Sequence, residues 1–245
     1  MAAGLVRGRP DLASALIYVD AIPAAAEGAA TQMGGRVGSV ADVAGCDLIV
    51  LAVKPKDAEA ALTEVGSTLE PQTVLLSVIA GWPIDRIRAL APHAGIARTM
   101  PNLAVRHGQG LVAIATSQVS ADTSRALHNV LSPLGAIIDM PEHLIGPATA
   151  LVGSGPGFVA LVAEGLEDGA VAIGFARDQA RAMVQAVLAG TAALLADGTD
   201  PADLRQRVSS PAGTTIEGIG VLERGSVRAH VADAVRAAAR RAAEL

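Results

Sequence analysis

Aromatic side chains and cysteines are nearly absent from this sequence. Only 2% of its 245 residues are aromatic, although 51% are hydrophobic, so the core must be built from Ala, Val, Leu and Ile. The single Cys46 excludes an intramolecular disulfide. The five histidines are scattered and no two have the spacing of metal ligands, so no metal site is expected.

The sequence also lacks a basic surface, a secretion signal and an unbroken apolar span. The net charge is −5 and there is no basic run beyond Arg240-Arg241, which argues against a nucleic-acid partner. The most apolar window, residues 150–166, is interrupted by Gly153, Gly155, Pro156 and Glu164, so we expect no membrane-spanning helix. With no signal peptide at its start, the chain is expected to be cytoplasmic. Its excess of aliphatic residues indicates a subunit interface.

Short apolar runs alternate with helical patterns in residues 1–143. Strands are expected at 15–19, 47–53, 73–79, 95–100, 111–115 and 136–140, and helices at 23–33, 57–69, 83–90 and 120–134. Continuous apolar strands separated by helices indicate a parallel sheet covered on both faces. From residue 144 onward the spacing is helical only. The sequence therefore predicts an α/β domain over 1–143 and an all-helical domain over 144–245.

Three short loops follow three of the expected strands. They are Val53-Lys54-Pro55, Ala80-Gly81 and Met100-Pro101-Asn102. Ligands of open α/β sheets bind at the carboxyl ends of the strands, where these loops meet. Any one of them is more often a plain loop, and Lys54 suits a solvated surface equally well. Three small or rigid loops in register indicate a nucleotide site.

Residues 208–217, Val-Ser-Ser-Pro-Ala-Gly-Thr-Thr-Ile-Glu, precede another helical pattern. Pro211 and Gly213 prevent a helix from beginning before Thr214, so the N–H groups of residues 212–215 are expected to face a ligand. Unpaired N–H groups and small hydroxyls at a helix start suit a carboxylate or a phosphate. An ordinary capped helix start is the alternative.

Seven motifs run in a fixed order through nearly the whole chain. They are Leu51-Ala-Val-Lys-Pro55, Ser77-Val-Ile-Ala-Gly81, Arg98-Thr-Met-Pro-Asn102, Gly153-Ser-Gly-Pro156, Asp168-Gly169 with Gly174, Val208-Ser-Ser-Pro-Ala-Gly-Thr-Thr215 and Leu222-Glu223. In these motifs the chain resembles the pyrroline-5-carboxylate reductase family. The resemblance implies a Rossmann-like dinucleotide-binding domain over 1–143 and a helical dimerisation and substrate domain over 144–245. It also implies a homodimer or a higher homo-oligomer.

The chain departs from the family at its start. The family opens with a strand and a G-x-G-x-x-G turn, whereas Met1–Gly8 here resembles the middle of the helix that follows that turn. The segment in question, a strand with the turn and the helix start, is about twenty residues long. We therefore expect an N-terminally truncated Rossmann domain whose remainder is encoded by in-frame codons upstream. A genuine truncation is the alternative.

The resemblance implies hydride transfer from NADH or NADPH to the C=N bond of 1-pyrroline-5-carboxylate, giving L-proline. It assigns Thr215 to the ring nitrogen and Ser210, Ala212, Gly213 and Thr214 to the substrate carboxylate. Alanine at position 212 is tolerable if its φ is negative. The residues that it assigns to the cofactor are Asp20, Val53, Lys54, Pro55, Ala80, Gly81, Met100, Pro101 and Asn102. Capping of its own helix is the alternative role for Thr215.

Other positions leave alternatives open. Asp20 ends a strand where an acidic side chain accepts from ribose hydroxyls and repels a 2′-phosphate, and no arginine follows closely, which favours NADH. Glu142 matches an acidic family position at the domain junction, or is a solvated loop charge. The Gly153–Pro156 stretch is interpreted as close helix packing rather than a site element.

Two other functions remain possible on the sequence. An inactive or regulatory dimeric homologue would explain the lack of the glycine turn. A reductase of another cyclic imine or of a 2-keto acid would be expected to carry a catalytic lysine or histidine in its helical domain. Residues 151–200 contain neither.

Overall fold

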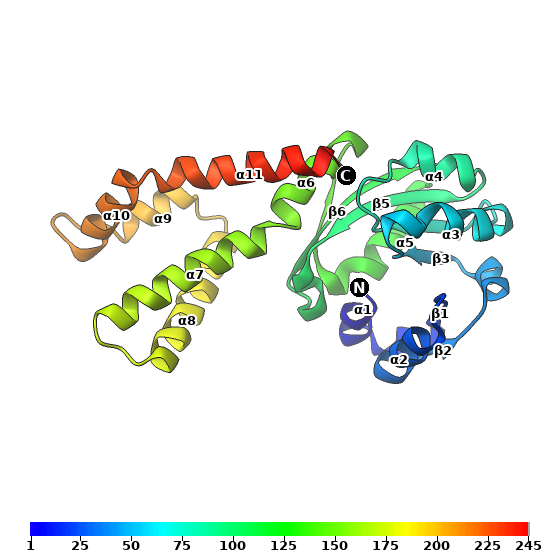
Figure 1. The fold of residues 1–245 in the computed structure, drawn as a ribbon, viewed down its shortest axis with the longest axis horizontal. Coiled ribbons are helices and arrows are strands. Elements are labelled where there is room, and N and C mark those ends of the chain that lie inside the picture. Colours follow the sequence, from blue (N-terminus) through cyan, green and yellow to red (C-terminus); the bar gives the residue numbers. More distant parts are fainter. Residues whose placement is uncertain (245) are drawn as a thin grey trace. The chain divides into compact units, whose positions relative to one another are not determined.

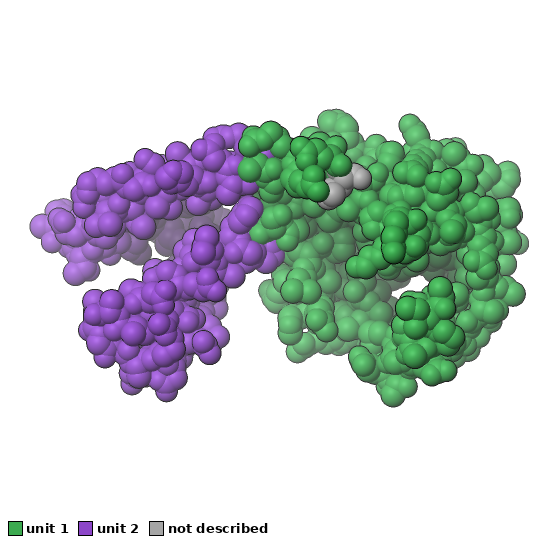
Figure 2. Space-filling model, in the orientation of Figure 1, with its two compact units in different colours: residues 1–154, 237–245 green, residues 155–236 purple. Residues whose placement is uncertain are grey.

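The computed structural model describes residues 1–244. The chain forms two compact units (Figure 2). The first comprises Met1–Ser154 with the end of the last helix from Ala237, and the second comprises Gly155–Arg236. The expected boundary lay near residue 143. The division falls later because the helix Ile145–Val152 packs on the sheet of the first unit.

A five-stranded sheet organises the first unit (Figure 1). Its strands, in spatial order, are β3 (Leu48–Leu51), β4 (Val74–Ser77), β5 (Gly95–Pro101), β6 (Gly110–Ser117) and β7 (Gly135–Asp139). All neighbours are parallel except β5 and β6, which are antiparallel. The expected wholly parallel sheet is thus wrong at that pair. Only the short 3₁₀ segment η5 (Leu103–His107) joins the two strands, and a parallel crossover needs about a dozen residues or more.

Helices cover both faces of this sheet. On one face lie α3 (Ala58–Val65), α4 (Ile84–Leu90) and α6 (Ile145–Val152), and on the other α1 (Ala2–Gly8) and α5 (Ala121–Leu131). Successive residues of a strand point to opposite faces. Leu75 accordingly packs with Leu62 and Ile87 on the first face, whereas Leu76 packs with Leu127 on the second. Trp82 is the only aromatic residue among the buried core side chains that the structure describes, so the predicted aliphatic core is confirmed.

A separate two-stranded parallel sheet holds the N-terminal part of the first unit. Strands β1 (Ile17–Tyr18) and β2 (Arg36–Val37) pair across the helix α2 (Pro23–Met33). The helix ends where the sequence predicted, because Gly34 and Gly35 have φ of 76° and 90°, a region that favours glycine. Within residues 1–244 no strand pairs with the outer edge of β3, so the two sheets are not joined.

The second unit is wholly helical. It contains α7 (Gly155–Ala172), α8 (Arg177–Ala196), α9 (Pro201–Arg207), α10 (Thr214–Arg224) and most of α11 (Val227–Ala243). Asp200 caps α9 by accepting from the Ala202 N–H at 2.7 Å, and Pro201 occupies the first helical position, as predicted. Ala180 and Val184 of α8 are the buried hydrophobic residues described in this unit. Most of its aliphatic side chains are exposed.

Two helical stretches are long and apolar enough to cross a membrane, namely Glu142–Ala172 and Arg177–Ala196. The expectation that no such stretch exists is therefore wrong by length and composition. The first stretch turns at Gly153 and Ser154, between α6 and α7. Only 17% of the apolar part of the first stretch and 11% of that of the second is buried within the chain. Most of these apolar side chains are therefore available to contact another surface. A subunit interface needs the same composition.

His128 fastens α5 to the edge strand β7. Its Nε2 lies 2.9 Å from Asp139 Oδ2 and its Nδ1 lies 2.8 Å from the carbonyl oxygen of Ser124. The Ser124 carbonyl, and then Asp139, raise the pKa of His128 above its usual 6.5, against the opposing effect of burial. The protonated ring therefore stabilises the fold below its usual pKa, and this contribution is lost as the pH rises through the raised pKa.

Replacing His128 with glutamine should consequently destabilise the protein more in acid than in base. We expect the difference in unfolding free energy to be about 0.5–1 kcal/mol near pH 6, falling towards zero by about pH 9. Denaturant titrations of both proteins across that range measure it. A difference that grew with rising pH would contradict this interpretation.

Candidate functional site

The carboxyl ends of β3, β4 and β5 bring the three predicted loops to one edge of the sheet. The strands are parallel, so the residues that follow them meet there. Val53, Lys54 and Pro55 are exposed after β3. Gly81 is exposed after β4 and has φ of 73°, where a side chain would be strained. This edge offers small, solvent-facing backbone to a ligand.

Trp82 joins two of these loops and was missed by the sequence analysis. Its indole Nε1 donates to the carbonyl oxygen of Pro55 at 3.1 Å, so the loop after β4 holds the loop after β3. The ring is buried, and the guanidinium of Arg86 lies 3.7 Å from its centroid. The sequence did contain a signal for this residue, because the only tryptophan of the chain directly follows Gly81 in one of the predicted loops.

At the end of β5, Met100 is buried and Asn102 is half-buried. Met100 is 9% exposed and belongs to the hydrophobic core, so little of it remains for a cofactor. Asn102 exchanges backbone and side-chain contacts with Leu111, whose N–H donates to the amide oxygen of Asn102 at 3.2 Å. The amide oxygen of Asn102 therefore braces β5 against β6, and its NH₂ group is the part suited to a ligand.

Asp20 ends β1 with an exposed carboxylate, as the sequence predicted. Its Oδ1 accepts from the Ile22 N–H at 2.8 Å, which fixes the side chain in the loop. In the neighbouring strand β2, Arg36 pairs at 2.5 Å with Asp42, which lies in the segment that follows β2. The Ser39 N–H, followed by Arg36, lowers the pKa of Asp42 to about 2. Arg36, which lies opposite Ile17 of β1 in the two-stranded sheet, is thus already paired with Asp42.

The second unit contains the serine–threonine segment as a tight turn before α10. The Gly213 N–H donates to the Ser210 carbonyl oxygen at 3.0 Å, and Ala212 has φ of 56°. This is the pattern of a turn with proline at its second and a left-handed residue at its third position. The condition of a negative φ for alanine at position 212 is therefore not met. The Gly213 N–H is also engaged in the turn rather than facing a ligand.

Gly213 is required by close approach. A Cβ there would lie 2.3 Å from the Ser210 hydroxyl oxygen, so only glycine allows that hydroxyl to stand beside the helix start. Helix α10 begins at Thr214 with Gly213 as its N-cap, as predicted, and no side chain caps it. The hydroxyl of Thr215 is therefore not the N-cap. The N–H groups of Thr214 and Thr215 belong to the first turn, which has no intrahelical acceptors.

Ion pairs hold this turn between its flanking helices. Glu223 of α10 pairs with Arg205 of α9 at 3.5 Å and with Arg228 at the start of α11. Ser209 donates its hydroxyl to the Arg205 carbonyl oxygen at 2.7 Å. Glu223 belongs to the Leu222-Glu223 motif, and its ion pairs with these two arginines give it a structural role.

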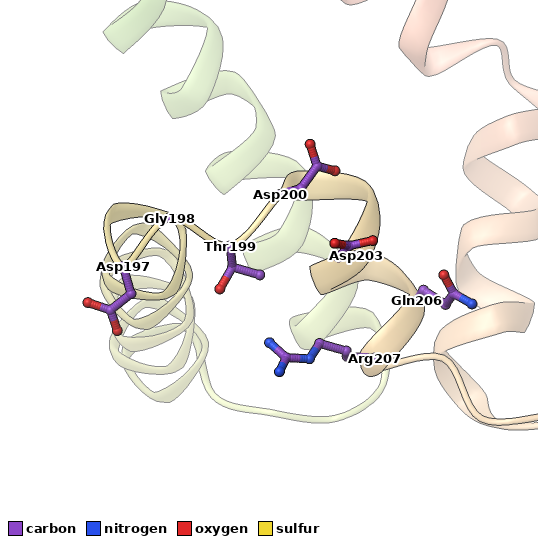
Figure 3. Close-up of a pocket in the computed structure, with 7 residues that line it drawn as sticks. All are labelled: Asp197, Gly198, Thr199, Asp200, Asp203, Gln206 and Arg207. Carbon is purple, nitrogen blue, oxygen red and sulfur yellow. The ribbon is translucent and has the colours of Figure 1, made fainter.

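An open cavity of about 560 Å³ lies beside the turn from α8 to α9. Its lining residues are Asp197, Gly198, Thr199, Asp200, Asp203, Gln206 and Arg207 (Figure 3). None of the predicted site residues is among them. Asp200 is already used as the cap of α9, so this cavity is a polar hollow at a helix turn.

Glu142 is not a solvated loop charge. It forms an ion pair with Arg98 of β5, and the same carboxylate oxygen accepts the Ile84 N–H. This contact lies within the first unit.

The first unit thus offers an exposed carboxylate after β1, exposed residues in the loops after β3 and β4, and half-buried residues at the end of β5. These features fit the ribose and the nicotinamide of a dinucleotide. The glycine turn that cradles a pyrophosphate does not occur in the sequence. The second unit offers the backbone N–H groups at the start of α10 beside the Ser210 hydroxyl, an arrangement that suits an anion.

Comparisons with known proteins agree with this arrangement. The family described as pyrroline-5-carboxylate reductase dimerisation matches residues 142–245. A pyrroline-5-carboxylate reductase of Synechocystis is 37% identical over 202 residues, which cover 81% of this chain and 75% of that protein. The structure of the Coxiella burnetii pyrroline-5-carboxylate reductase matches with a TM-score of 0.91 at 26% identity, over 99% of this chain and 92% of that one.

A more distant structure shares the fold. The pyrroline carboxylate reductase of Plasmodium falciparum, solved with NADP bound, matches with a TM-score of 0.84 at 24% identity. The match covers 99% of this chain and 92% of that one. The predicted combination of a Rossmann-like sheet domain and a helical domain is confirmed by these matches.

Proposed function

The chain belongs to the pyrroline-5-carboxylate reductase family, and we propose that it reduces the C=N bond of 1-pyrroline-5-carboxylate to give L-proline. The observation that carries the proposal is the turn from Ser210 to Thr215. It places hydroxyls and unpaired N–H groups at one helix start, which suits the carboxylate of a small imine acid. In this turn the Ser210 hydroxyl occupies space that a Cβ at position 213 would need.

The residues of the turn divide the work between binding and chemistry. The substrate carboxylate is held by the N–H groups of Thr214 and Thr215 and by the Ser210 hydroxyl. Ala212 presents its N–H from the turn, and Gly213 contributes by giving Ser210 room. The Thr215 hydroxyl is assigned to the ring nitrogen, where the proton of the iminium ends as an amine N–H. Orientation and electrostatic stabilisation supply the rate enhancement.

NADH or NADPH supplies the hydride that the imine carbon accepts. Asp20 is assigned to the ribose, and Val53, Lys54, Pro55, Ala80 and Gly81 to the surface that receives the nicotinamide half. Pro101 and the Asn102 NH₂ complete that surface, while Met100 supports it from the core. The division of the chain into domains at 1–143 and 144–245 and its cytoplasmic location belong to the same proposal.

Purified protein incubated with 1-pyrroline-5-carboxylate and reduced nicotinamide tests the proposal. Loss of the absorbance of the reduced cofactor should be matched by proline formation in equal amount. A 2-keto acid and a six-membered cyclic imine acid serve as competing substrates. Preference for either of these two substrates would favour a reductase of that related class. If none of the three substrates led to oxidation of the cofactor, a non-enzymatic dimeric homologue would be favoured.

We expect a preference for NADH, because the Asp20 carboxylate repels a 2′-phosphate and Arg36 is already paired with Asp42. Replacing Asp20 with serine should shift the ratio of kcat/KM values towards NADPH by roughly tenfold, or about 1.4 kcal/mol. Asp11→Ser, which removes a carboxylate paired with Arg9, is the control. A wild-type enzyme that clearly preferred NADPH would refute the assignment.

A further inference from the structure

Arg98 places a positive charge inside the sheet. It lies in β5, opposite Ser77 of β4 and Ala115 of β6, and is 8% exposed. Its neighbours two residues away, Ile96 and Met100, belong to the hydrophobic core beneath α3, α4 and α6, so its side chain leaves the same face. A buried guanidinium is unfavourable unless it is paired, so its partner explains its presence.

That partner is Glu142, which holds two groups on one oxygen. Glu142 Oε1 accepts from Arg98 Nη1, and it also accepts the Ile84 N–H at 3.3 Å. Ile84 is the first residue of α4, where the backbone N–H has no intrahelical acceptor. The side chain of Arg98 is 10% exposed and that of Glu142 is 35% exposed, so the pair is largely shielded from water.

The carboxylate of Glu142 lies where three segments of the first unit meet. Helix α4 follows directly on the loop from Ala80 to Pro83, and β5 runs from Arg98 into Met100 and Pro101. Glu142 itself begins the 3₁₀ segment η7 (Glu142–Leu144), which leads into α6. Together with the bond from Trp82 to Pro55, this contact connects the loops after β3, β4 and β5.

We propose that Glu142 is a positioning residue for hydride transfer. By holding Arg98 and the Ile84 N–H together, it fixes the loops after β4 and β5 relative to each other, and so the surface that receives the nicotinamide. The proposal rests on the reductase function proposed above. Glu142 acts through Arg98 and Ile84 and is not assigned to substrate or cofactor.

Two substitutions separate positioning from stability. Glu142→Gln keeps the size and one acceptor but removes the charge that pairs with Arg98. The double variant Arg98→Met with Glu142→Leu replaces the pair by apolar side chains, an exchange that is often neutral or stabilising. Asp122→Asn, which removes the carboxylate of the exposed Arg125–Asp122 pair on α5, is the control.

Trp82 supplies a readout that needs no cofactor. It is the only tryptophan, it is 3% exposed, and it lies in the loop that Glu142 is proposed to fix. We expect Glu142→Gln to increase the rate constant for acrylamide quenching of Trp82 several-fold. In steady-state kinetics kcat should fall about tenfold while KM for the imine acid changes little, because the reacting groups are misplaced rather than removed.

The double variant should regain the wild-type melting temperature but keep the low kcat. Recovery of both would mean that the pair contributes only stability, and unchanged quenching in Glu142→Gln would equally overturn the proposal. If the wild-type protein turned over no imine acid, the proposed function would fail by itself. In that case the rate constants for acrylamide quenching of Trp82 in the Glu142→Gln and Asp122→Asn proteins would still be compared. This comparison by itself would decide whether Glu142 fixes the loop.

Discussion

Replacing Thr215 with alanine is expected to lower kcat for 1-pyrroline-5-carboxylate by roughly ten- to a hundredfold, with little change in melting temperature. The proposed hydrogen bond between the Thr215 hydroxyl and the ring nitrogen would strengthen in the transition state, and such a bond is worth about 1–3 kcal/mol. Thr215 is the second residue of α10 and is not its N-cap, so its removal should cost the helix little.

Ser210→Ala should instead raise KM, because a contact with the carboxylate is made equally in the ground state and the transition state. Thr63→Ala is the matched control, since the Thr63 hydroxyl bonds only the Glu59 carbonyl oxygen of its own helix. Steady-state kinetics and thermal melts of the three variants separate these roles. A Thr215→Ala protein with full kcat and a lower melting temperature would make Thr215 a purely structural residue.

Placing aspartates on α7 and α8 is expected to abolish self-association. Leu161 is 69% exposed and Val187 is 58% exposed, and the dimerisation family matches this region. Burying each apolar side chain contributes about 1.5–3 kcal/mol, and an unpaired carboxylate at an interface adds a desolvation penalty. Leu161→Asp with Val187→Asp should therefore raise the dimer dissociation constant by roughly a thousandfold or more, equal to about 4 kcal/mol.

Sedimentation velocity over a concentration series measures this change. Ser67→Asp adds a charge at an exposed position of the first unit and should leave the association state unaltered. The alternative is that a lipid membrane, and not a second subunit, covers these two helices, and a requirement for detergent to keep the protein in solution tests it. A double variant that remained dimeric, or a wild-type protein that was monomeric without detergent, would contradict a subunit interface on this face.

Much of the fold was predictable because it depends on neighbouring residues. The aliphatic runs fixed the strands, Gly34 ended α2, Pro201 opened α9, and Gly213 delayed α10 to Thr214. Each of these features follows from backbone propensity and hydrophobic spacing within one or two turns of chain. The loops at the carboxyl edge were predictable for the same reason, since parallel strands bring their ends together.

Local chain geometry decided two features that the sequence patterns did not predict. They are the antiparallel direction of β6 and the positive φ of Ala212. A connection too short for a crossover reversed the strand direction, and the bond between Ser210 and Gly213 imposed a positive φ on a residue that does not favour it. Propensity gives only the average preference of a residue, and the length of a connection or a hydrogen bond within a turn can override it.

Sequence alone determined that this chain is an aliphatic α/β protein with a helical second part, and which loops meet at the carboxyl edge of the sheet. Only the tertiary structure decided which side chains hold those loops. Trp82 meets Pro55 across 27 positions and Arg98 meets Glu142 across 44. A pattern read along the chain carries no information on such pairs, because their energy arises only when the packed sheet excludes water and brings distant polar groups together.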